Sequence, residues 1–214
     1  MSAIPYVLAI ETSGDWCSVA VGAEGEVLKE ASLHMPYGQA AHILKLVEEV
    51  SVVFDKDWHQ VSKIVVNRGP GSFTGIRVGL SVAEGFAYAG KIPLVGVTGF
   101  QVYRALFDKE QDLCVVLDSR RDGHFVACFE KNQWAVKEHV IMRWEEVQKQ
   151  KRSTILTNVH ALKDDDVLYK PLTAEMLLKA YRVLAGHVCE FSDKPFYLKS
   201  PDIHESCTTK RTAY

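Results

Sequence analysis

Apolar and polar residues follow two patterns along the chain, and the first is that of strands. Short apolar runs bounded by turn residues predict strands. In the first half we expect strands over Val7–Ile10, Ser18–Gly22, Val27–Ser32, Ile64–Val66 and Pro93–Val97. In the second half the same pattern predicts strands over Cys114–Leu117, Phe125–Glu130, Ala135–His139 and Thr154–Thr157.

The second pattern is that of helices, in which apolar residues recur at spacings of three and four. The expected helices are Gly38–Phe54, Gly75–Ala89, Gly99–Phe107, Met142–Gln150 and Thr173–Gly186. The charged stretch Lys163–Asp166 predicts a turn. Strands that alternate with helices favour an α/β fold.

The predicted helix Gly75–Ala89 is apolar around most of its circumference. Its polar residues Arg77, Ser81, Glu84 and Tyr88 fall on one narrow line. A helix with this pattern is expected to be covered on more than one side. Two alternatives stay open: burial within its own domain, or a subunit interface on part of the surface.

A glycine-rich run stands between the strand Ile64–Val66 and this helix. Gly69, Gly71 and Gly75 can adopt positive φ angles at little steric cost, so the backbone can turn sharply here. Thr74 is the expected N-cap of the helix. Such a corner suits a phosphate or a carboxylate, although tight packing alone is the alternative. It is not a Walker P-loop, because no Lys-Ser/Thr pair follows the second glycine.

The chain also contains an internal repeat. Leu8–Val21 and Val115–Cys128 share one layout, an apolar run, an acidic turn and a second apolar run. Glu11 and Asp118 occupy equivalent positions at the ends of the first runs. The repeat predicts two related α/β halves, which we place at residues 1–107 and 108–214.

Composition limits the class of protein. With 47% hydrophobic residues in 214, the chain can bury a sizeable core, and no apolar run reaches the roughly 18 residues of a membrane span. The first residues lack the pattern of a signal peptide, and we expect a cytoplasmic protein. A net charge of −2 argues against a nucleic-acid binder that acts alone. The cysteines, odd in number and widely spaced, are expected to be reduced thiols: Cys17, Cys114, Cys128, Cys189 and Cys207.

Several of these segments together resemble the bacterial TsaB family, also called YeaZ. The matching segments are Ile10–Ser13, Gly69–Gly79, Ile92–Val97, Leu117–Arg121 and Tyr197–Asp202. The resemblance implies the actin/hexokinase/Hsp70-like (ASKHA) duplicated fold, with two small α/β lobes that face a cleft. It also implies a non-catalytic partner of the enzyme TsaD, also called Gcp. With the ATPase TsaE, that pair installs the threonylcarbamoyl group on the adenosine beside the anticodon of certain tRNAs.

The resemblance also indicates which chemistry to expect. The catalytic relative holds a metal with a His-x-x-x-His pair, and the corresponding stretch Thr98–Leu106 contains no histidine. We therefore expect no metal site and no peptidase or transferase activity of its own. In this fold class, two acidic hairpins grip the nucleotide phosphates and magnesium. The equivalent positions here are treated as vestigial phosphate-loop positions: Glu11, Thr12, Ser13, Gly69, Gly71, Ser72 and Asp118.

The leading hypothesis is a scaffold subunit that presents its first-lobe helices to TsaD. Candidate interface residues are Ala40, Leu44, Val47, Ala83, Phe86 and Ala87. We expect no cofactor in the isolated chain, with room for ATP or ADP at the boundary of the complex. We also expect tRNA contact only within the complex and a homodimer in isolation. The competing hypothesis is a small ATPase or kinase that uses Glu11 and Asp118. A peptidase or cell-wall role has no ligand set to support it.

Overall fold

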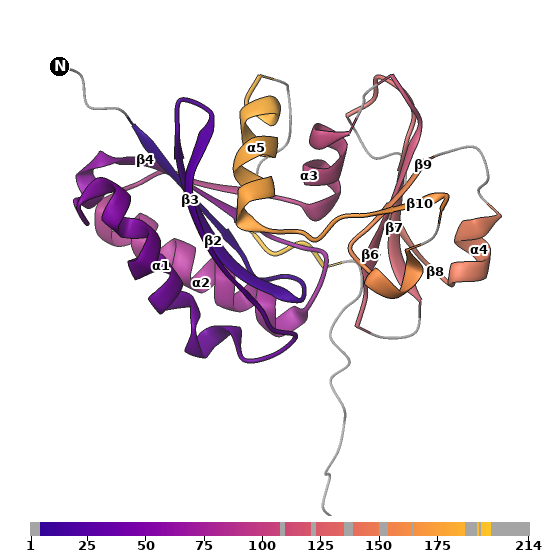
Figure 1. Cartoon of the computed structure of the whole chain (residues 1–214), viewed down its shortest axis with the longest axis horizontal. Helices are drawn as coiled ribbons and strands as arrows, with labels where there is room; N and C mark the ends of the chain where they lie inside the picture. Colours follow the sequence, from indigo (N-terminus) through magenta and orange to yellow (C-terminus); the bar gives the residue numbers. More distant parts are fainter. Residues whose placement is uncertain are drawn as a thin grey trace, which may run out of the picture.

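Two five-stranded mixed sheets form the protein in a computed structural model (Figure 1). The structure describes residues 5–107, 110–120, 123–134, 139–149, 154–163, 165–186, 192 and 194–197. None of the helices in these ranges is long and apolar enough to cross a membrane.

The first sheet is built from the first half of the chain. Its strands are β1 (Tyr6–Glu11), β2 (Trp16–Ala23), β3 (Glu26–His34), β4 (Val61–Asn67) and β5 (Leu94–Val97). Their order in space is β3-β2-β1-β4-β5. Strand β1 runs antiparallel to β2 and parallel to β4, so it lies at the centre of the sheet.

The second sheet repeats this arrangement. Its strands are β6 (Leu113–Asp118), β7 (His124–Phe129), β8 (His139–Met142), β9 (Thr154–Thr157) and β10 (Val167–Tyr169). The order β10-β9-β6-β7-β8 matches the first sheet strand for strand. Strand β6 likewise pairs antiparallel with β7 and parallel with β9. The internal repeat predicted from the two acidic hairpins is therefore confirmed.

The first half of the chain contains more helix than the second. They are α1 (Ile43–Ser51), α2 (Phe73–Gly90), α3 (Gly99–Leu106), α4 (Trp144–Gln148) and α5 (Ala174–Leu184), with short 3-10 turns η1 (Gln39–Ala41), η2 (Val52–Phe54), η3 (Trp58–Gln60) and η4 (His160–Leu162). Helices α1 and α2 cover the outer face of the first sheet, and α3 and α5 lie between the sheets (Figure 1). Where α2 stands in the first half, the described residues of the second half form the three-residue turn η4.

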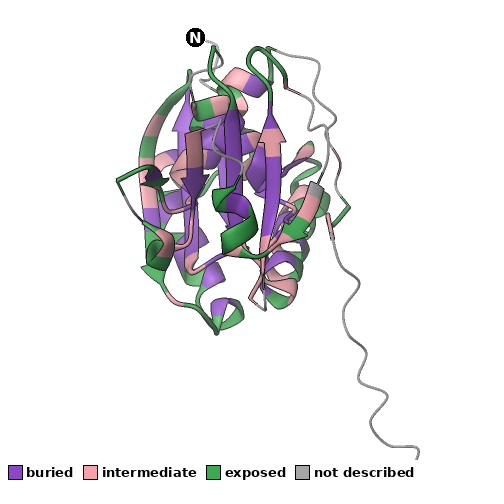
Figure 2. Cartoon of the chain, turned by 90° about the vertical axis from the view of Figure 1, so that its right-hand side faces the viewer, coloured by how far each residue is buried: buried purple, intermediate pink, exposed green. Residues whose placement is uncertain are grey.

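Alternation along β1 divides the core into layers. Leu8 and Ile10 face α1 and α2, whereas Ala9 faces the layer between the sheets. That inner layer also contains side chains of α3, α5 and the second sheet, and Figure 2 shows strands at the centre of the molecule as continuously buried. The two sheets therefore share one core.

Helix α5 comes from the second half of the chain but packs mainly on the first. Its contacts include β1, β2 and α3. Its first turn is capped across the halves, because Ala174 N donates to Ser18 Oγ at 2.8 Å and Glu175 N donates to Glu30 Oε1 at 2.9 Å. The division at residue 107 stays a prediction, and α5 lies on the far side of it in sequence but against the first sheet in space.

Some predicted elements were wrong in the second half. Met142 belongs to strand β8, and the helix expected from Met142 to Gln150 is the five-residue α4. The strand β10 directly after the predicted charged turn was missed, because three residues are too few to show the alternation of apolar and polar residues that predicts a strand. Residues 135–138 of the strand expected over Ala135–His139 lie outside the described residues.

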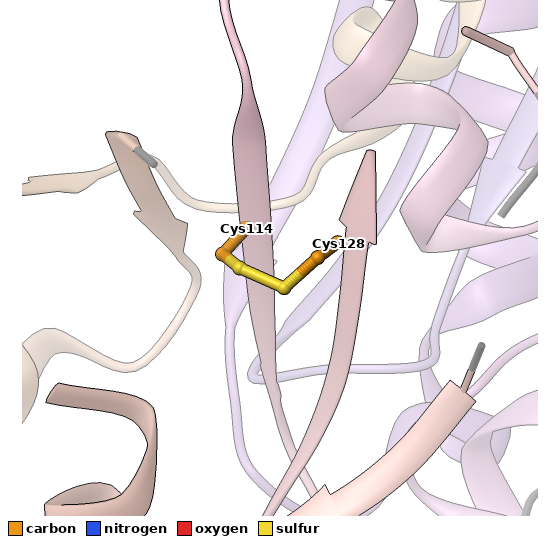
Figure 3. Close-up of a disulfide and its surroundings, with 2 residues drawn as sticks. All are labelled: Cys114 and Cys128. Carbon is orange, nitrogen blue, oxygen red and sulfur yellow. A yellow bond between two sulfur atoms is a disulfide. The ribbon is translucent and has the colours of Figure 1, made fainter. Parts of the chain in front are cut away.

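The prediction of reduced thiols is wrong for two cysteines. Cys114 and Cys128 face each other in the register of β6 and β7 and form a disulfide, with their Cα atoms 4.2 Å apart (Figure 3). A separation of 14 in sequence hides this proximity, which the hairpin creates. Among the described cysteines Cys17 is free and buried, while Cys189 and Cys207 lie outside the described residues.

Candidate partner-binding groove and acidic corner

The glycine-rich run forms a loop with a cis peptide bond between Gly69 and Pro70. Gly69 has a φ of 115°, as expected for a glycine turn, and Gly71 has a positive φ too. The N-cap of α2 is Ser72, whose Oγ accepts a hydrogen bond from Gly75 N at 3.2 Å. The prediction of Thr74 as the cap was therefore wrong.

Gly75 could adopt a positive φ, but it does not take one. It lies inside α2, and a Cβ added there would collide with the carbonyl oxygen of Thr12. The residue is thus a glycine because the first turn of α2 presses against the β1–β2 turn. The same turn holds the loop, since Ser72 N donates to Ser13 O at 2.7 Å and Thr12 Oγ1 donates to Gly75 O at 2.7 Å.

We call Glu11, Thr12, Ser13, Asn67 and the loop Gly69–Ser72 the acidic corner. The Glu11 carboxylate is fully buried and accepts hydrogen bonds from Ser13 N at 2.5 Å, Ser13 Oγ at 2.6 Å and Asn67 Nδ2 at 2.6 Å. Asn67 Oδ1 in turn accepts from Gly69 N at 2.9 Å. The network therefore joins the end of β1 to the start of the glycine-rich loop.

Burial raises the pKa of Glu11 from 4.5 to about 7, and the hydrogen bonds from Ser13 and Asn67 oppose that shift. The nearby Cys17 thiol is also buried, and its pKa is raised to about 11 by burial and by the Glu11 charge. This thiol stays protonated at neutral pH.

The second acidic hairpin faces the first across the two sheets. Asp118 N donates to Asn158 Oδ1 at 3.0 Å, and Arg120 N donates to Asp118 Oδ1 at 2.8 Å. The Arg120 guanidinium contacts Asp15 Oδ1 at 2.7 Å and Asp118 Oδ2 at 3.4 Å. One cation of the chain thus sits between carboxylates of both hairpins, while Arg121 lies outside the described residues.

Within the described ranges, no group of three or more His, Cys, Asp or Glu side chains is placed to hold a metal ion. The stretch Thr98–Leu106 begins instead with a capping box, in which the side chains of Thr98 and Gln101 cap the start of α3.

The other candidate site is the outer face of α1 and α2. Among the residues predicted to contact a partner, Val47 and Ala83 are buried in the protein's own core. Ala40 and Leu44 are exposed, Leu44 by 59%, and Phe86 and Ala87 are partly buried. Trp58 covers one side of Phe86, with ring centroids 4.4 Å apart. The predicted set therefore divides into core residues and surface residues.

A groove of about 430 Å³ runs between η1, α1 and α2. We call it the docking groove, and it is lined by Ala40, Ile43, Leu44, Phe73, Thr74, Arg77, Val78, Ser81 and Val82. Sequence reasoning named Ala40 and Leu44 but missed Phe73, Val78 and Val82. Of the line of polar residues predicted on α2, Arg77 and Ser81 border the groove, whereas Tyr88, which is 89% exposed, lies at a separate pocket near the end of the helix.

The segment before residue 198 returns to this face. Phe196 N donates to Arg68 O at 2.7 Å, and the Tyr197 ring lies 5.2 Å from that of Phe73. Arg77 Nε donates to Tyr197 Oη at 3.2 Å, and its guanidinium stacks 3.8 Å above the Phe73 ring. The rest of the predicted element Tyr197–Asp202 lies outside the described residues.

Comparison with known proteins extends over most of the chain. A family model described as TsaD, tRNA N6-adenosine threonylcarbamoyltransferase, matches residues 38–170. The tRNA threonylcarbamoyladenosine biosynthesis protein TsaB of Escherichia coli K12 is 34% identical over 92 residues, which are 43% of this chain and 39% of that protein. The protein of the same name in Haemophilus influenzae is 32% identical over 120 residues, 53% of this chain and 49% of that protein.

The aligned stretches thus span less than half of each of these two curated relatives. The solved structure of YeaZ from Pseudomonas aeruginosa superposes with a TM-score of 0.68 at 22% identity, over 91% of this chain and 100% of that one. That likeness shows the fold, and the two-lobed α/β class expected from sequence is confirmed.

Proposed function

The chain belongs to the TsaD family, in its TsaB (YeaZ) branch, and on that premise we propose that it is a non-catalytic scaffold subunit. It pairs with TsaD, and with TsaE, to form the N6-threonylcarbamoyladenosine modification beside the anticodon of tRNA. The name of the two TsaB relatives, which refers to the biosynthesis of threonylcarbamoyladenosine, supports this proposal.

The observation that carries the proposal is the docking groove. Ile43, Val78 and Val82 line it, and Leu44 stands at its edge with more than half of its side chain exposed. Exposed apolar surface with a polar rim is typical of protein interfaces. Leu44, Thr74 and Arg77 in the lining are exposed, while Ile43 at the base of the groove belongs to the core, so a partner that fills the groove would extend the protein's own apolar core.

The acidic corner supports a non-catalytic role. The Ser72 and Gly75 N–H groups, which a phosphate would need, are already bonded to Ser13 O and Ser72 Oγ. The Glu11 carboxylate already accepts hydrogen bonds from Ser13 and Asn67, which leaves it less free to hold a magnesium ion. The Arg120 guanidinium likewise lies between the carboxylates of Asp15 and Asp118. These contacts argue against the competing ATPase or kinase, and we expect no peptidase activity.

The same proposal sets the remaining partners. A nucleotide, ATP or ADP, is placed at the boundary with TsaD and not in this chain alone. tRNA is contacted within the complex, in the cytoplasm, where tRNA is modified. Without TsaD, the docking groove of one copy is covered by a second copy, which gives a homodimer.

Charge in the docking groove tests the scaffold role. Leu44→Asp is expected to abolish co-purification with TsaD, because it places a carboxylate on apolar surface that the partner would bury. Leu168→Asp is the matched control, since Leu168 is 46% exposed on β10, in the other sheet. Circular dichroism confirms that both variants fold.

Reconstitution of the tRNA modification with TsaD and TsaE gives the second readout. The wild-type chain and Leu168→Asp should support it, and Leu44→Asp should not. Association and modification that survive both Leu44→Asp and Val78→Asp would contradict the proposed function.

A further inference from the structure

Arg77 differs from other arginines of the protein in what surrounds it. Arg120 and Arg182 each form ion pairs with carboxylates, and Arg104 is buried against backbone carbonyls. Arg77 is exposed, and it makes no ion pair with any residue in the described ranges. Among the described residues, the Arg77 charge in the lining of the docking groove is therefore not neutralised by a carboxylate.

The Arg77 side chain is nevertheless held in one place. Phe73 lies under its guanidinium at 3.8 Å, and Tyr197 Oη accepts the Nε proton at 3.2 Å. A guanidinium held by an aromatic face and a hydrogen bond has already lost much of its rotamer freedom before a partner binds. Arginine and aromatic residues of this kind dominate the affinity of many interfaces.

The residues around the groove indicate which anionic group Arg77 binds. The exposed charges of α1 and α2 have both signs, because Lys45 accompanies Glu49 on α1, Glu84 lies on α2, and Glu48 pairs with Lys56 at 2.9 Å. A nucleic-acid backbone, with a phosphate at every nucleotide, calls for several cations, whereas Arg77 is the only charged residue among the described residues that line the groove. A single carboxylate on an otherwise apolar protein segment fits, because it meets the cation at one end and apolar residues along the rest.

We propose that Arg77, held by Phe73 and Tyr197, is the charged anchor of the docking groove and binds a carboxylate of the protein that fills it. This proposal rests on the proposed function, in which that protein is TsaD. Arg77 contributes binding and register, and Tyr197 is a positioning residue that acts through it. The segment ending at Tyr197 thus takes part in partner recognition from the opposite end of the sequence.

Titration calorimetry of the full-length chain with TsaD tests the anchor. Arg77→Gln should weaken binding by about 10- to 100-fold, the usual effect of losing a charge-assisted contact at an interface. Tyr197→Phe should weaken it by about 3- to 10-fold, because the ring remains and the hydrogen bond to Nε is lost. Arg182→Gln, on the exposed side of α5, should bind like the wild type.

Salt and cross-linking identify the chemistry of the contact. Raising the salt concentration should weaken the wild-type complex more than the Arg77→Gln complex. In Arg77→Lys, a carbodiimide should join the Lys amine to the partner carboxylate as an amide, and mass spectrometry of the linked peptides then identifies the acidic residue of TsaD.

The outcomes separate the two proposals. If Arg77→Gln binds TsaD like the wild type while Leu44→Asp does not, the anchor is overturned and the docking groove stands. If neither variant changes binding, the proposed function fails with it. If Arg77→Gln leaves TsaD binding intact but weakens tRNA binding by the complex, the anion is an RNA phosphate, and the carboxylate proposal is overturned.

Discussion

The Glu11 carboxylate receives three hydrogen bonds inside the protein, from Ser13 N, Ser13 Oγ and Asn67 Nδ2. All three partners are donors, so the network matches the ionised form. Burial acts in the opposite direction and raises the pKa to about 7. The protein therefore stabilises the loop Gly69–Ser72 with an acid that is half protonated near neutral pH.

This balance predicts a pH dependence of stability. The pKa of Glu11 in the folded protein, about 7, lies above the unfolded value of 4.5, so the contribution of this group is fully present below pH 4.5 and is lost as the pH rises through 7. The free energy of unfolding should fall by about 3 kcal/mol over that range from Glu11 alone. Urea unfolding from about pH 5 to about pH 8 measures it.

Glu11→Gln removes the titrating group. The free energy of unfolding of this variant should therefore depend less steeply on pH than that of the wild type. The new amide N–H2 also faces the donors of Asn67 or Ser13. We therefore expect the free energy of unfolding of Glu11→Gln to be lower than that of the wild type by about 1 to 3 kcal/mol, even at the pH where the two values are closest. Because His124, whose pKa is lowered by burial, titrates in both proteins, the difference between them isolates Glu11. Equal slopes in the two proteins would refute the assignment.

Single residues also show where sequence reasoning reached its limit. The acids Glu11 and Asp118 were found because the repeat places them at equivalent turns. The pairing of Cys114 with Cys128 and the contact of Tyr197 with Arg77 depend on which strands and segments become neighbours. No local pattern carries that information, because these partners are brought together by the register of a hairpin and by the return of the chain.

At the scale of elements, α2 combines close packing with an open face. Gly75 and Gly79 lie against Thr12, where an added Cβ would collide. Gly85, two turns later, has no heavy atom within 4 Å of the place where a Cβ would stand. Two of the helix's glycines are thus required by packing, whereas Gly85 is not required by any neighbour among the described residues.

The glycines give a matched pair of substitutions in one helix. Gly85→Ala should raise the free energy of unfolding by about 0.5 to 1 kcal/mol, because alanine costs less backbone entropy in a helix and meets open space. Gly75→Ala should lower it by about 1 to 3 kcal/mol, since the Cβ forces α2 away from the β1–β2 turn. Urea unfolding of both variants checks the pair, and an equal effect of the two would show that packing at Thr12 is unimportant.

The prediction of α1 and α2 from sequence succeeded for the helices and partly failed for their faces. Leu44 and Val47 were both assigned to the partner, but the 3-10 turn η1 comes before α1, and of the two Leu44 is exposed while Val47 is buried. Ala83 is small and was assigned to the partner, yet it packs in the core. A period of 3.6 fixes a stripe only when the helix is continuous, and η1 interrupts it.

At the scale of the whole molecule, the layer between the sheets belongs to both halves. Ala9, Val65 and Val97 of the first sheet pack in one cluster with Leu113, Phe125 and side chains of α5. Such a shared core predicts one cooperative unfolding transition. The repeat in the sequence describes how the fold is built, and it does not imply that each half is stable alone.

A fragment of residues 1–107 tests this expectation. It lacks α5 and the second sheet, so the inner face of its own sheet would stand in water. We expect it to show no cooperative urea transition, whereas the full chain shows one that coincides by fluorescence and circular dichroism. A fragment that unfolds cooperatively would show that the division at residue 107 separates two autonomous domains.

Helix α5 has a consequence for biosynthesis. The ribosome completes the strands of the first sheet well before it reaches residue 184, where α5 ends. At roughly 5 to 20 residues per second, the stretch from residue 108 to residue 184 takes about 4 to 15 seconds to translate. During that interval the inner, apolar face of the nascent sheet is exposed to water. General chaperones bind surfaces of this kind, so the yield of this protein in cells should depend on them.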